Sequence, residues 1–336
     1  MFLGDSAIGR VIDFAKRRLV LLMPRRPRPY PELARLRELF DSKGSSPQVL
    51  LLGDSVAERV SRFDKDRRSL GNLLAAEFKS TYRFVCISHS AYHLKIFEAF
   101  LETLRLMKHK PKLVILPVNM RSFSPQWDLE PSWQFDREIE ALKEYASNSQ
   151  RAIPALREMA VLPDQYERFD ATEVQYPSTS FNRVGQFRLV INAKPQSKEQ
   201  FNYRKKQIFI FHYLHKLSTT HTKLKSLIRI AKKMKSMNIG LLVYITPVNY
   251  QGGNRYVGNI FSSLLKKNVH VVRQILNPYL SREIRLIDLS QYLTSDQFFN
   301  IDEPTEHLNQ HGRAKLASRI FNSAMEMMAL KGSIVS

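Results

Sequence analysis

Two polar residues of the sequence have the type and setting of a nucleophile and its base. Ser55 follows the apolar run 48–52 and the dipeptide Gly53-Asp54, and a helical pattern comes after it. A serine at a strand-to-helix turn holds its hydroxyl at the sheet edge, where backbone N–H groups can stabilise developing negative charge. His307 lies in a carboxylate-rich stretch ahead of the final helix, which suits a general base oriented by an acid. The pair therefore predicts acyl-transfer chemistry at a site assembled from distant parts of the chain.

Three acidic residues near His307 are candidates for orienting its imidazole. Asp302 and Glu303 precede it by a few positions, and Glu306 is its direct neighbour. We expect Asp302 to take this role, because a short loop can bring its carboxylate back to the imidazole, whereas a directly adjacent side chain ordinarily points away. Glu303 and Glu306 remain alternatives.

The serine and histidine segments resemble two conserved blocks of the SGNH hydrolases, a family also called GDSL esterases and lipases. Gly53-Asp54-Ser55 is similar to the first block, which implies that Ser55 is the nucleophile. His307, followed by Leu308-Asn309 and then Gly312, is similar to the last block, which supplies the catalytic base. The family usually has an aspartate three positions before this histidine, and here that position is Pro304.

Two further segments resemble the blocks of this family that bind the oxyanion. The segment 86–91 is similar to the second block, in which the backbone N–H of a glycine faces the oxyanion; Ala91, or alternatively Ser90, stands at that position. An alanine keeps this donor as long as the turn does not require a positive φ. Asn119 is similar to the asparagine of the third block, whose side-chain amide donates to the oxyanion, although Pro117 and Met120 replace the usual flanking Gly and Asp.

The resemblance implies a serine esterase or O-acyltransferase that needs neither cofactor nor metal. Its substrate would be an acylated or acyl-accepting carbohydrate, as in the construction of bacterial surface polysaccharides. The motifs do not separate water from a sugar hydroxyl as the acyl acceptor. A catalytically inactive SGNH-like scaffold that binds carbohydrate is an alternative, and the displaced acid favours it.

The elements that hold these residues alternate between apolar strands and amphipathic helices. This rhythm predicts βαβ units around a mostly parallel sheet covered by helices on both faces, a three-layer αβα fold of the SGNH or flavodoxin-like type. Each candidate residue then lies at or just beyond the carboxyl end of a strand, where open α/β sheets bind ligands. The expected strands are 48–52, 82–87, 112–118, 240–246 and 284–289, and the expected helices are 32–40, 56–63, 70–78, 96–107, 223–237, 257–276 and 312–328.

The chain divides into a basic N-terminal segment and one large domain. Residues 1–45 read as a basic helical segment with a Pro-broken connector, and residues 46–330 as the SGNH-like domain. Within that domain the alternation lapses over 121–236, which we expect to be an inserted subdomain or cap. Trp127 and Trp133, with Asp128 and Glu130 beside them, are more typical of packing but also fit a carbohydrate-binding face.

Composition limits the classes of partner and compartment. The chain has 336 residues, 43% of them hydrophobic, which suffices for a large buried core. The one cysteine, Cys86, excludes an intrachain disulfide framework and a Cys-rich metal site. The net charge of +21 favours anionic partners. No run approaches the roughly 20 apolar residues of a spanning helix. Because the first thirty residues lack the layout of a secretory signal, we expect a cytoplasmic protein whose basic N-terminus could touch the anionic inner face of a membrane.

The basic excess also suits a protein that binds nucleic acid or another anion, since Lys and Arg are dense over 194–235. Many of these residues lie opposite the apolar stripe of a helix, and no zinc finger or phosphate-binding loop accompanies them, so nucleic acid is the weaker hypothesis. The pairs His89/His93 and His212/His215 have spacings that could hold a metal on a helix. No HExxH-type carboxylate accompanies them, which favours structural roles.

Overall fold

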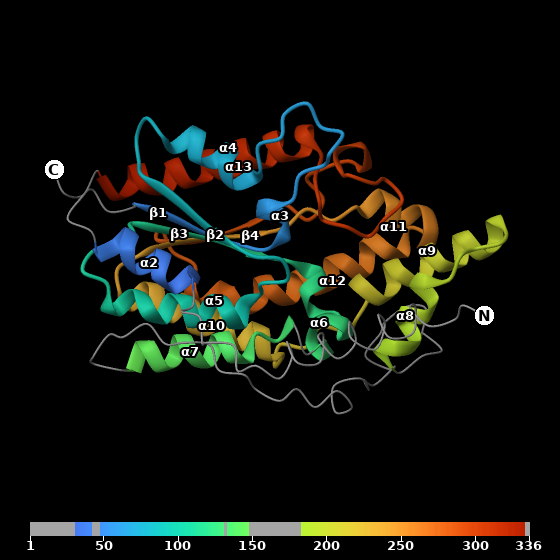
Figure 1. The fold of residues 1–336 in the computed structure, drawn as a ribbon, viewed down its shortest axis with the longest axis horizontal. Coiled ribbons are helices and arrows are strands. Elements are labelled where there is room, and N and C mark those ends of the chain that lie inside the picture. The colour runs from blue at the N-terminus through green and yellow to red at the C-terminus, as the bar shows by residue number, and fades with distance from the viewer. Residues whose placement is uncertain (1–30, 42–47, 131–132, 148–182, 333–336) are drawn as a thin grey trace, which may run out of the picture.

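A five-stranded parallel sheet forms the centre of the molecule (Figure 1). The computed structural model describes residues 31–41, 48–130, 133–147 and 183–332. The strand order is β2-β1-β3-β4-β5, and every neighbouring pair is parallel. This doubly wound order confirms the predicted fold class. The strands are β1 (Val49–Gly53), β2 (Phe84–Ser88), β3 (Leu113–Val118), β4 (Gly240–Ile245) and β5 (Ile284–Asp288).

Helices cover both faces of the sheet, which makes the three layers visible in Figure 1. The three inner strands β1, β3 and β4 are buried at every position, as expected for strands with a helix layer on each side. One face carries α4 (Leu70–Phe78) and α13 (Gln310–Gly332); the other carries α2 (Pro31–Asp41), α5 (Leu94–Thr103), α10 (Thr222–Ser236) and α12 (Ile260–Leu276).

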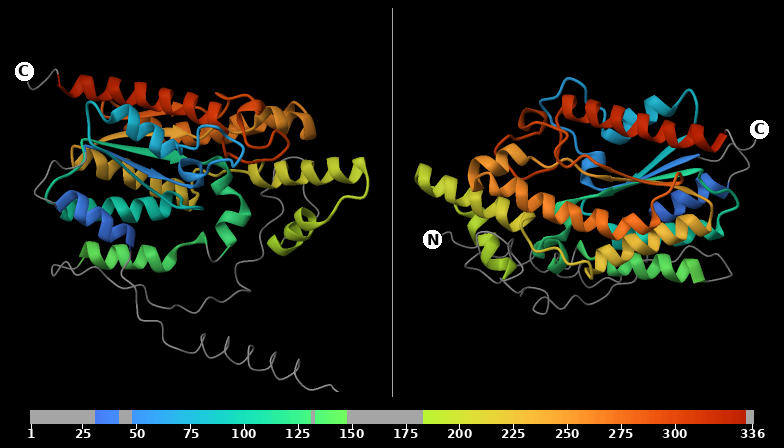
Figure 2. Two further views of the ribbon diagram at one scale, coloured as in Figure 1. Left: turned by 45° about the horizontal axis from the view of Figure 1, so that its top comes forward. Right: turned by 180° about the vertical axis from the view of Figure 1, so that it is seen from behind.

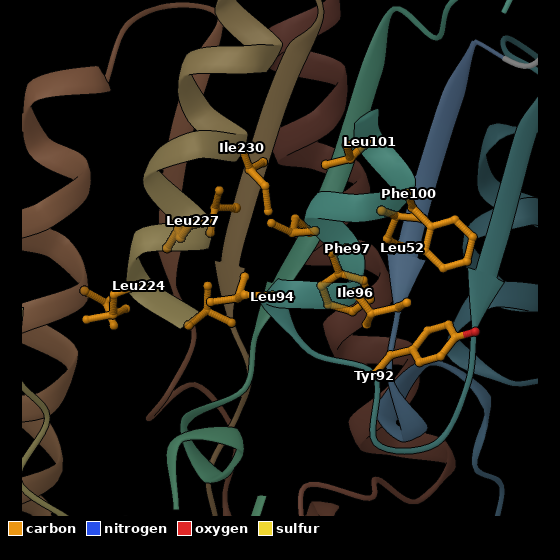
Figure 3. Close-up of a cluster of buried hydrophobic side chains, with 14 of the residues drawn as sticks. Leu52, Tyr92, Leu94, Ile96, Phe97, Phe100, Leu101, Leu224, Leu227 and Ile230 are labelled. Carbon is orange, nitrogen blue, oxygen red and sulfur yellow. The ribbon is translucent and has the colours of Figure 1, made fainter. Parts of the chain in front are cut away.

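The two faces have separate hydrophobic cores. The larger core joins α5 and α10 to the sheet through residues such as Leu94, Phe97, Leu227 and Ile230, which Figure 3 shows converging between the two helices. Phe97 of α5 is 1% exposed, and Leu227 and Ile230 of α10 are fully buried. The smaller core packs α4 and α13 against the opposite face. Burial of these apolar stripes, more than helix propensity, holds the layers together.

The described parts of the interval 121–236 contain five α-helices, which lie in different places in the fold. The last of them, α10, belongs to the helix layer on the sheet, and α7 (Asp136–Ser147) packs outside α5. The short α6 (Pro125–Leu129) lies near the carboxyl ends of the strands. In the views of Figures 1 and 2, α8 (Val184–Asn192) and α9 (Lys198–Tyr213) form an arm at that end of the molecule, with a small core of its own made by Phe187, Ile208 and Phe211.

The expected helix over 56–63 is wrong beyond its first turn. Helix α3 spans only Ser55–Glu58, because Arg59 adopts an extended conformation with ψ 135°. The remaining chain to Ser69 forms a loop. The expected helix over 257–276 corresponds to α12, which begins at Ile260. A separate helix that was not expected, α11 (Tyr250–Val257), precedes it and ends at Gly258, whose φ of 98° suits glycine.

The described residues contain no helix that is both long and apolar enough to cross a lipid bilayer. The expected basic helix at the N-terminus lies mostly in residues 1–30, outside the described part of the chain. The division into residues 1–45, 46–330 and the insertion 121–236 stays a prediction.

Candidate active site

Ser55 and His307 meet at the carboxyl end of the sheet. Ser55 Oγ and His307 Nε2 are 3.0 Å apart and share a hydrogen bond, although 252 positions separate the residues. Both side chains are half-buried. In this strand order the chain passes from β1 to β2 on one side and then crosses to β3 on the other side of β1. The loops after β1 and β3 therefore leave the sheet in opposite directions, and ligands bind at such a switch point. Ser55, directly after β1, stands at this point.

The turn that presents Ser55 is fixed by its two preceding residues. Asp54 caps α3 by accepting a 2.8 Å hydrogen bond from the Val56 N–H. Gly53 has no room for a side chain, because a Cβ there would lie 2.5 Å from the Ala57 Cβ. Ser55 therefore occupies the first position of α3. None of the hydrogen bonds between described residues uses its N–H, which leaves this donor available to a ligand.

The loop that carries His307 is held by backbone contacts with Phe298 and Phe299 and by burial of Leu308. Phe298 and Leu308 form an antiparallel bridge, and the Phe299 N–H donates to the His307 carbonyl at 2.9 Å. The His307 N–H donates to Thr305 Oγ1 at 3.1 Å. Leu308 is 1% exposed and anchors the loop in the smaller core. These contacts fix the backbone on both sides of the imidazole.

Asn119 and Asp54 join the ends of β3 and β1. The Asn119 Nδ2 donates to Asp54 Oδ2 at 2.8 Å, and Asn119 Oδ1 accepts from the Arg121 N–H at 3.0 Å. Burial raises the pKa of Asp54 to about 6, against the opposing effect of the hydrogen bonds from Asn119 and Val56. An amide nitrogen has two hydrogens, so Asn119 keeps a second donor after binding Asp54.

Ala91 lies in the loop that follows β2, beside the Ser55 turn. The register aligns Gly53 with Ser88, so the loops that follow β1 and β2 start side by side. Ala91 has a φ of 69°, so the condition set for an alanine at this position, a turn without positive φ, is not met, and the alanine itself adopts the left-handed conformation. For a non-glycine residue this costs roughly 1–2 kcal/mol. Within the described residues the Ala91 N–H makes no backbone hydrogen bond, whereas the alternative, Ser90, uses its hydroxyl to donate to Glu58 Oε1 at 2.8 Å.

The expectation that Asp302 orients His307 is corrected by the structure. Asp302 Oδ1 instead accepts hydrogen bonds from Arg255 Nη1 at 2.7 Å and from the Tyr256 hydroxyl at 2.9 Å. These partners lie on α11 and draw the carboxylate away from the imidazole. The reason is charge, because Arg255 forms an ion pair with Asp302 and the neutral imidazole cannot.

The two alternative acids do not hydrogen bond to His307 either. Glu303 pairs with Lys205 of α9. Glu306 is buried and accepts a hydrogen bond from the Tyr213 hydroxyl, and Arg121 Nη1 lies 3.5 Å from its other oxygen. Burial raises the pKa of Glu306 against the opposing effects of Arg121 and Tyr213. Across the described residues, no carboxylate is hydrogen bonded to the imidazole of His307.

The surroundings of His307 favour its neutral form. Burial is the main cause that lowers the pKa of His307 to about 4, and the positive charges of Arg121 and Arg59 lower it further. Neither arginine was predicted from the sequence. Their only local signal is position: Arg59 follows α3 one turn after Ser55, and Arg121 follows Asn119 by two residues.

Comparison with protein-family models finds no match for this sequence, and neither does comparison with curated proteins. Solved structures with similar folds include a catalytic mutant of Axe2, an acetylxylan esterase from Geobacillus stearothermophilus. It is 14% identical, with a TM-score of 0.41 over 83% of this chain and 94% of that chain. A putative platelet activating factor from Streptococcus pneumonia is 10% identical, with a TM-score of 0.39 over 94% and 98% of the two chains. LAE5, an alpha/beta hydrolase enzyme from the metagenome of Lake Arreo, Spain, is 11% identical, with a TM-score of 0.37 over 84% and 97%.

Two other groups considered from the sequence have structural partners. His93 caps α5, and its Nε2 lies 2.9 Å from the Trp133 carbonyl oxygen. Within the described residues no three His, Cys, Asp or Glu side chains converge as metal ligands. Trp127 is 4% exposed and packs against Trp133 with ring centroids 5.2 Å apart. These contacts agree with the packing interpretation of the two tryptophans.

Proposed function

We propose that this chain is a serine-dependent esterase or O-acyltransferase of the SGNH type, with Ser55 as nucleophile and His307 as general base. The observation that carries the proposal is the 3.0 Å hydrogen bond between Ser55 Oγ and His307 Nε2 at the switch point of the sheet. A nucleophile and base within hydrogen-bond reach are the geometric requirement for this chemistry.

In the proposed reaction His307 takes the proton of Ser55 as Oγ attacks the carbonyl carbon of an ester. The N–H groups of Ser55 and Ala91 and the Asn119 amide are the proposed donors to the tetrahedral oxyanion. The C–O bond to the alcohol then breaks, and His307 returns the proton to that alcohol. Attack on the acyl-enzyme by water gives hydrolysis, and attack by a sugar hydroxyl gives O-acyl transfer.

His307 would act in this proposal without a carboxylate partner. The acid of a triad holds the imidazole in place and stabilises the imidazolium. Here the backbone contacts of the loop take over the positioning, while nearby arginines disfavour the imidazolium. Turnover of simple esters should accordingly be slow for a serine esterase. The carbohydrate substrate, the absence of any required cofactor and a site at the inner face of a membrane remain proposals that rest on the resemblance and on charge.

The test of the proposal is hydrolysis of p-nitrophenyl acetate together with covalent labelling by a fluorophosphonate. Wild type should turn over the ester and gain one phosphonyl adduct by mass spectrometry, and Ser55→Ala should lose both. Ser80→Ala removes an exposed hydroxyl near the start of β2 and is the matched control. Activity that persists in Ser55→Ala would remove Ser55 from its role.

A second candidate, an inactive scaffold that binds carbohydrate, is favoured by the missing hydrogen bond between His307 and a carboxylate in the described residues. It predicts neither turnover nor phosphonyl adduct in wild type. Nucleic-acid binding remains the weaker hypothesis. Binding of duplex DNA at physiological salt concentration would support it.

A further inference from the structure

The loop that follows the nucleophile is strongly basic. Residues 59–69 contain five Lys or Arg and two acids, Asp64 and Asp66. The loop begins one turn after Ser55, since the Arg59 N–H donates to the Ser55 carbonyl at 2.9 Å. Its five cationic side chains are all exposed. They are Arg59, Arg62, Lys65, Arg67 and Arg68.

Both acids of this loop are engaged by other arginines. Asp64 is 8% exposed in its side chain and pairs at 2.7 Å with Arg313 of α13, which is itself 1% exposed. Asp66 pairs at 2.7 Å with Arg68. Arg313 also donates to the carbonyls of Asp66 and Arg68, which fastens the second half of the loop to α13. The acids therefore do not offset the charge of Arg59 and Arg62.

Arg59 and Arg62 lie in the first half of the loop, the half that leads away from Ser55. The Arg59 guanidinium donates to Ser90 Oγ at 3.4 Å, in the same loop as Ala91. The Arg62 guanidinium lies 4.7 Å from the ring centroid of Phe63, which is 82% exposed. Neither arginine has an ion-pair partner among the described residues, and the nearby Glu58 uses one oxygen to accept from Ser90.

A third arginine follows β3, the strand on the other side of the switch point from β1. Arg121 follows Asn119 after β3, and its Nε is buried without a hydrogen-bond partner in the described part of the chain. Its guanidinium is 3.5 Å from Glu306, and its side chain is 22% exposed. Arg121 thus follows the proposed donor Asn119 by two residues, and Arg59 contacts the loop that carries Ala91. The positive charges of both arginines lower the pKa of His307.

We propose that Arg59, Arg62 and Arg121 form an anion-binding rim around Ser55 and His307, so that the preferred substrate carries a carboxylate or phosphate group next to the ester. This proposal rests on the proposed function. Guanidinium groups with free donors recognise these planar or tetrahedral anions by charge-assisted hydrogen bonds. Phe63 adds an apolar face on which a sugar ring can stack. An acidic sugar chain fits both features.

The experiment compares release of acetate from O-acetylated homogalacturonan, which is anionic, with release from O-acetylated xylan, which is neutral. Wild type should have the higher kcat/KM on the anionic polymer, and the preference should decline as NaCl rises from 0.05 to 0.5 M. Arg59→Gln and Arg62→Gln should each lower the preference about two- to fivefold, the range of an exposed charge pair. Lys112→Gln removes one exposed charge at the opposite edge of the sheet and should leave the preference unchanged. Equal kcat/KM on the two polymers at low salt would overturn the proposal.

A binding measurement tests the anion-binding rim without requiring esterase activity. Fluorescein-labelled trigalacturonate is titrated into the full-length chain carrying Ser55→Ala, with maltotriose as the neutral competitor and tripolyphosphate as the phosphate competitor. Displacement by unlabelled trigalacturonate alone identifies a carboxylate site, and displacement by tripolyphosphate as well identifies a general anion site. Binding that is lost in Arg62→Gln supports the rim even if wild type proves to have no esterase activity. Binding that is equal in the Arg62 and Lys112 variants overturns the rim while leaving the esterase proposal intact.

Discussion

The hydrogen bond from Asn119 to Asp54 connects the proposed oxyanion donor to the residue before the nucleophile. Asp54 uses one oxygen for the Val56 N–H and the other for Asn119 Nδ2, so one carboxylate orients both the helix that starts at Ser55 and the amide. Asp54 is 1% exposed and Asn119 5%, and water therefore does not compete for these bonds. The acid of the Gly53-Asp54-Ser55 motif is in this structure a positioning group.

Substitutions of Asp54 and Asn119 should distinguish the residue that positions the amide from the residue that donates to the oxyanion. Asn119→Ala should lower kcat for p-nitrophenyl acetate about 10²–10³-fold with little change in KM, as loss of one oxyanion donor does. Asp54→Asn places an amide against the Asn119 amide, two donors face to face, and should lower kcat less, because Asn119 is displaced but present. An Asp54→Asn variant with a larger loss than Asn119→Ala would contradict this order of roles.

The titration of His307 should be visible in the pH profile of the proposed ester hydrolysis. In the proposed reaction its neutral form is the base, and its pKa is lowered to about 4 by burial and by Arg121 and Arg59. The acid limb of kcat/KM for a neutral ester is accordingly expected near pH 4, below the ordinary histidine value of about 6.5. Arg59→Gln removes one of the opposing charges and should shift this limb to higher pH. A limb near 6.5 in wild type would contradict the environment described for His307.

At the scale of elements, Arg313 connects α13 to the loop 59–69, which follows Ser55. Its guanidinium pairs with Asp64 and donates to the carbonyls of Asp66, Arg68 and Leu308. A single buried side chain at the start of α13 thus holds both the loop 59–69 and the end of the His307 loop. Arg313 therefore contributes to the position of both halves of the proposed site.

Arg313→Met should destabilise the protein by about 3–5 kcal/mol in urea unfolding, because it leaves the Asp64 carboxylate buried without a partner. Arg313→Met combined with Asp64→Leu should recover part of this loss, as expected when both members of a buried pair become apolar. The control is Arg285→Met, which breaks an exposed pair with Glu326 and should cost less than about 1 kcal/mol. Equal losses for the Arg313 and Arg285 variants would show that the connection made by Arg313 does not matter.

The strands and most helices could be predicted from the sequence because their signals are local. The apolar run at Leu113–Val118 predicts a strand buried on both faces, and the stripe of α10 predicts its helix. The expected helix over 56–63 is wrong for a non-local reason. Arg313, far along the chain, binds the Asp64 carboxylate and the Asp66 carbonyl and so holds the following segment as a loop. Asp302 was misassigned for the same reason, since its partners Arg255 and Tyr256 lie on another helix. Motif resemblance found Ser55 and His307, but no local pattern pointed to Arg59 or Arg121.

At the scale of the whole molecule, burial of histidines sets the response to acid. His93, His212 and His215 are 2–4% exposed, and burial is the main cause that lowers the pKa of each. His307 belongs to the same group, with its pKa near 4. Between pH 6.5 and about 4 the unfolded chain binds protons at these four residues and the folded chain does not. The free energy of unfolding must then fall as pH falls through this window.

The slope of that fall can be tested by urea unfolding between pH 7 and pH 5. Each such histidine contributes up to about 1.4 kcal/mol per pH unit below 6.5, whereas Asp54, whose pKa is raised to about 6, acts in the opposite direction. Four histidines outweigh the carboxyls with raised pKa, Asp54 and Glu306, so stability should drop on acidification. His212→Met should reduce the slope, because His212 packs against Phe187 and Phe211 and its Nδ1 has no hydrogen-bond partner in the described residues. His270→Gln, at an exposed position of α12, should leave it unchanged. A free energy of unfolding that is constant or rises from pH 7 to pH 5 would mean that these imidazoles take up protons in the folded protein, and that the helix layer around α9 opens to water.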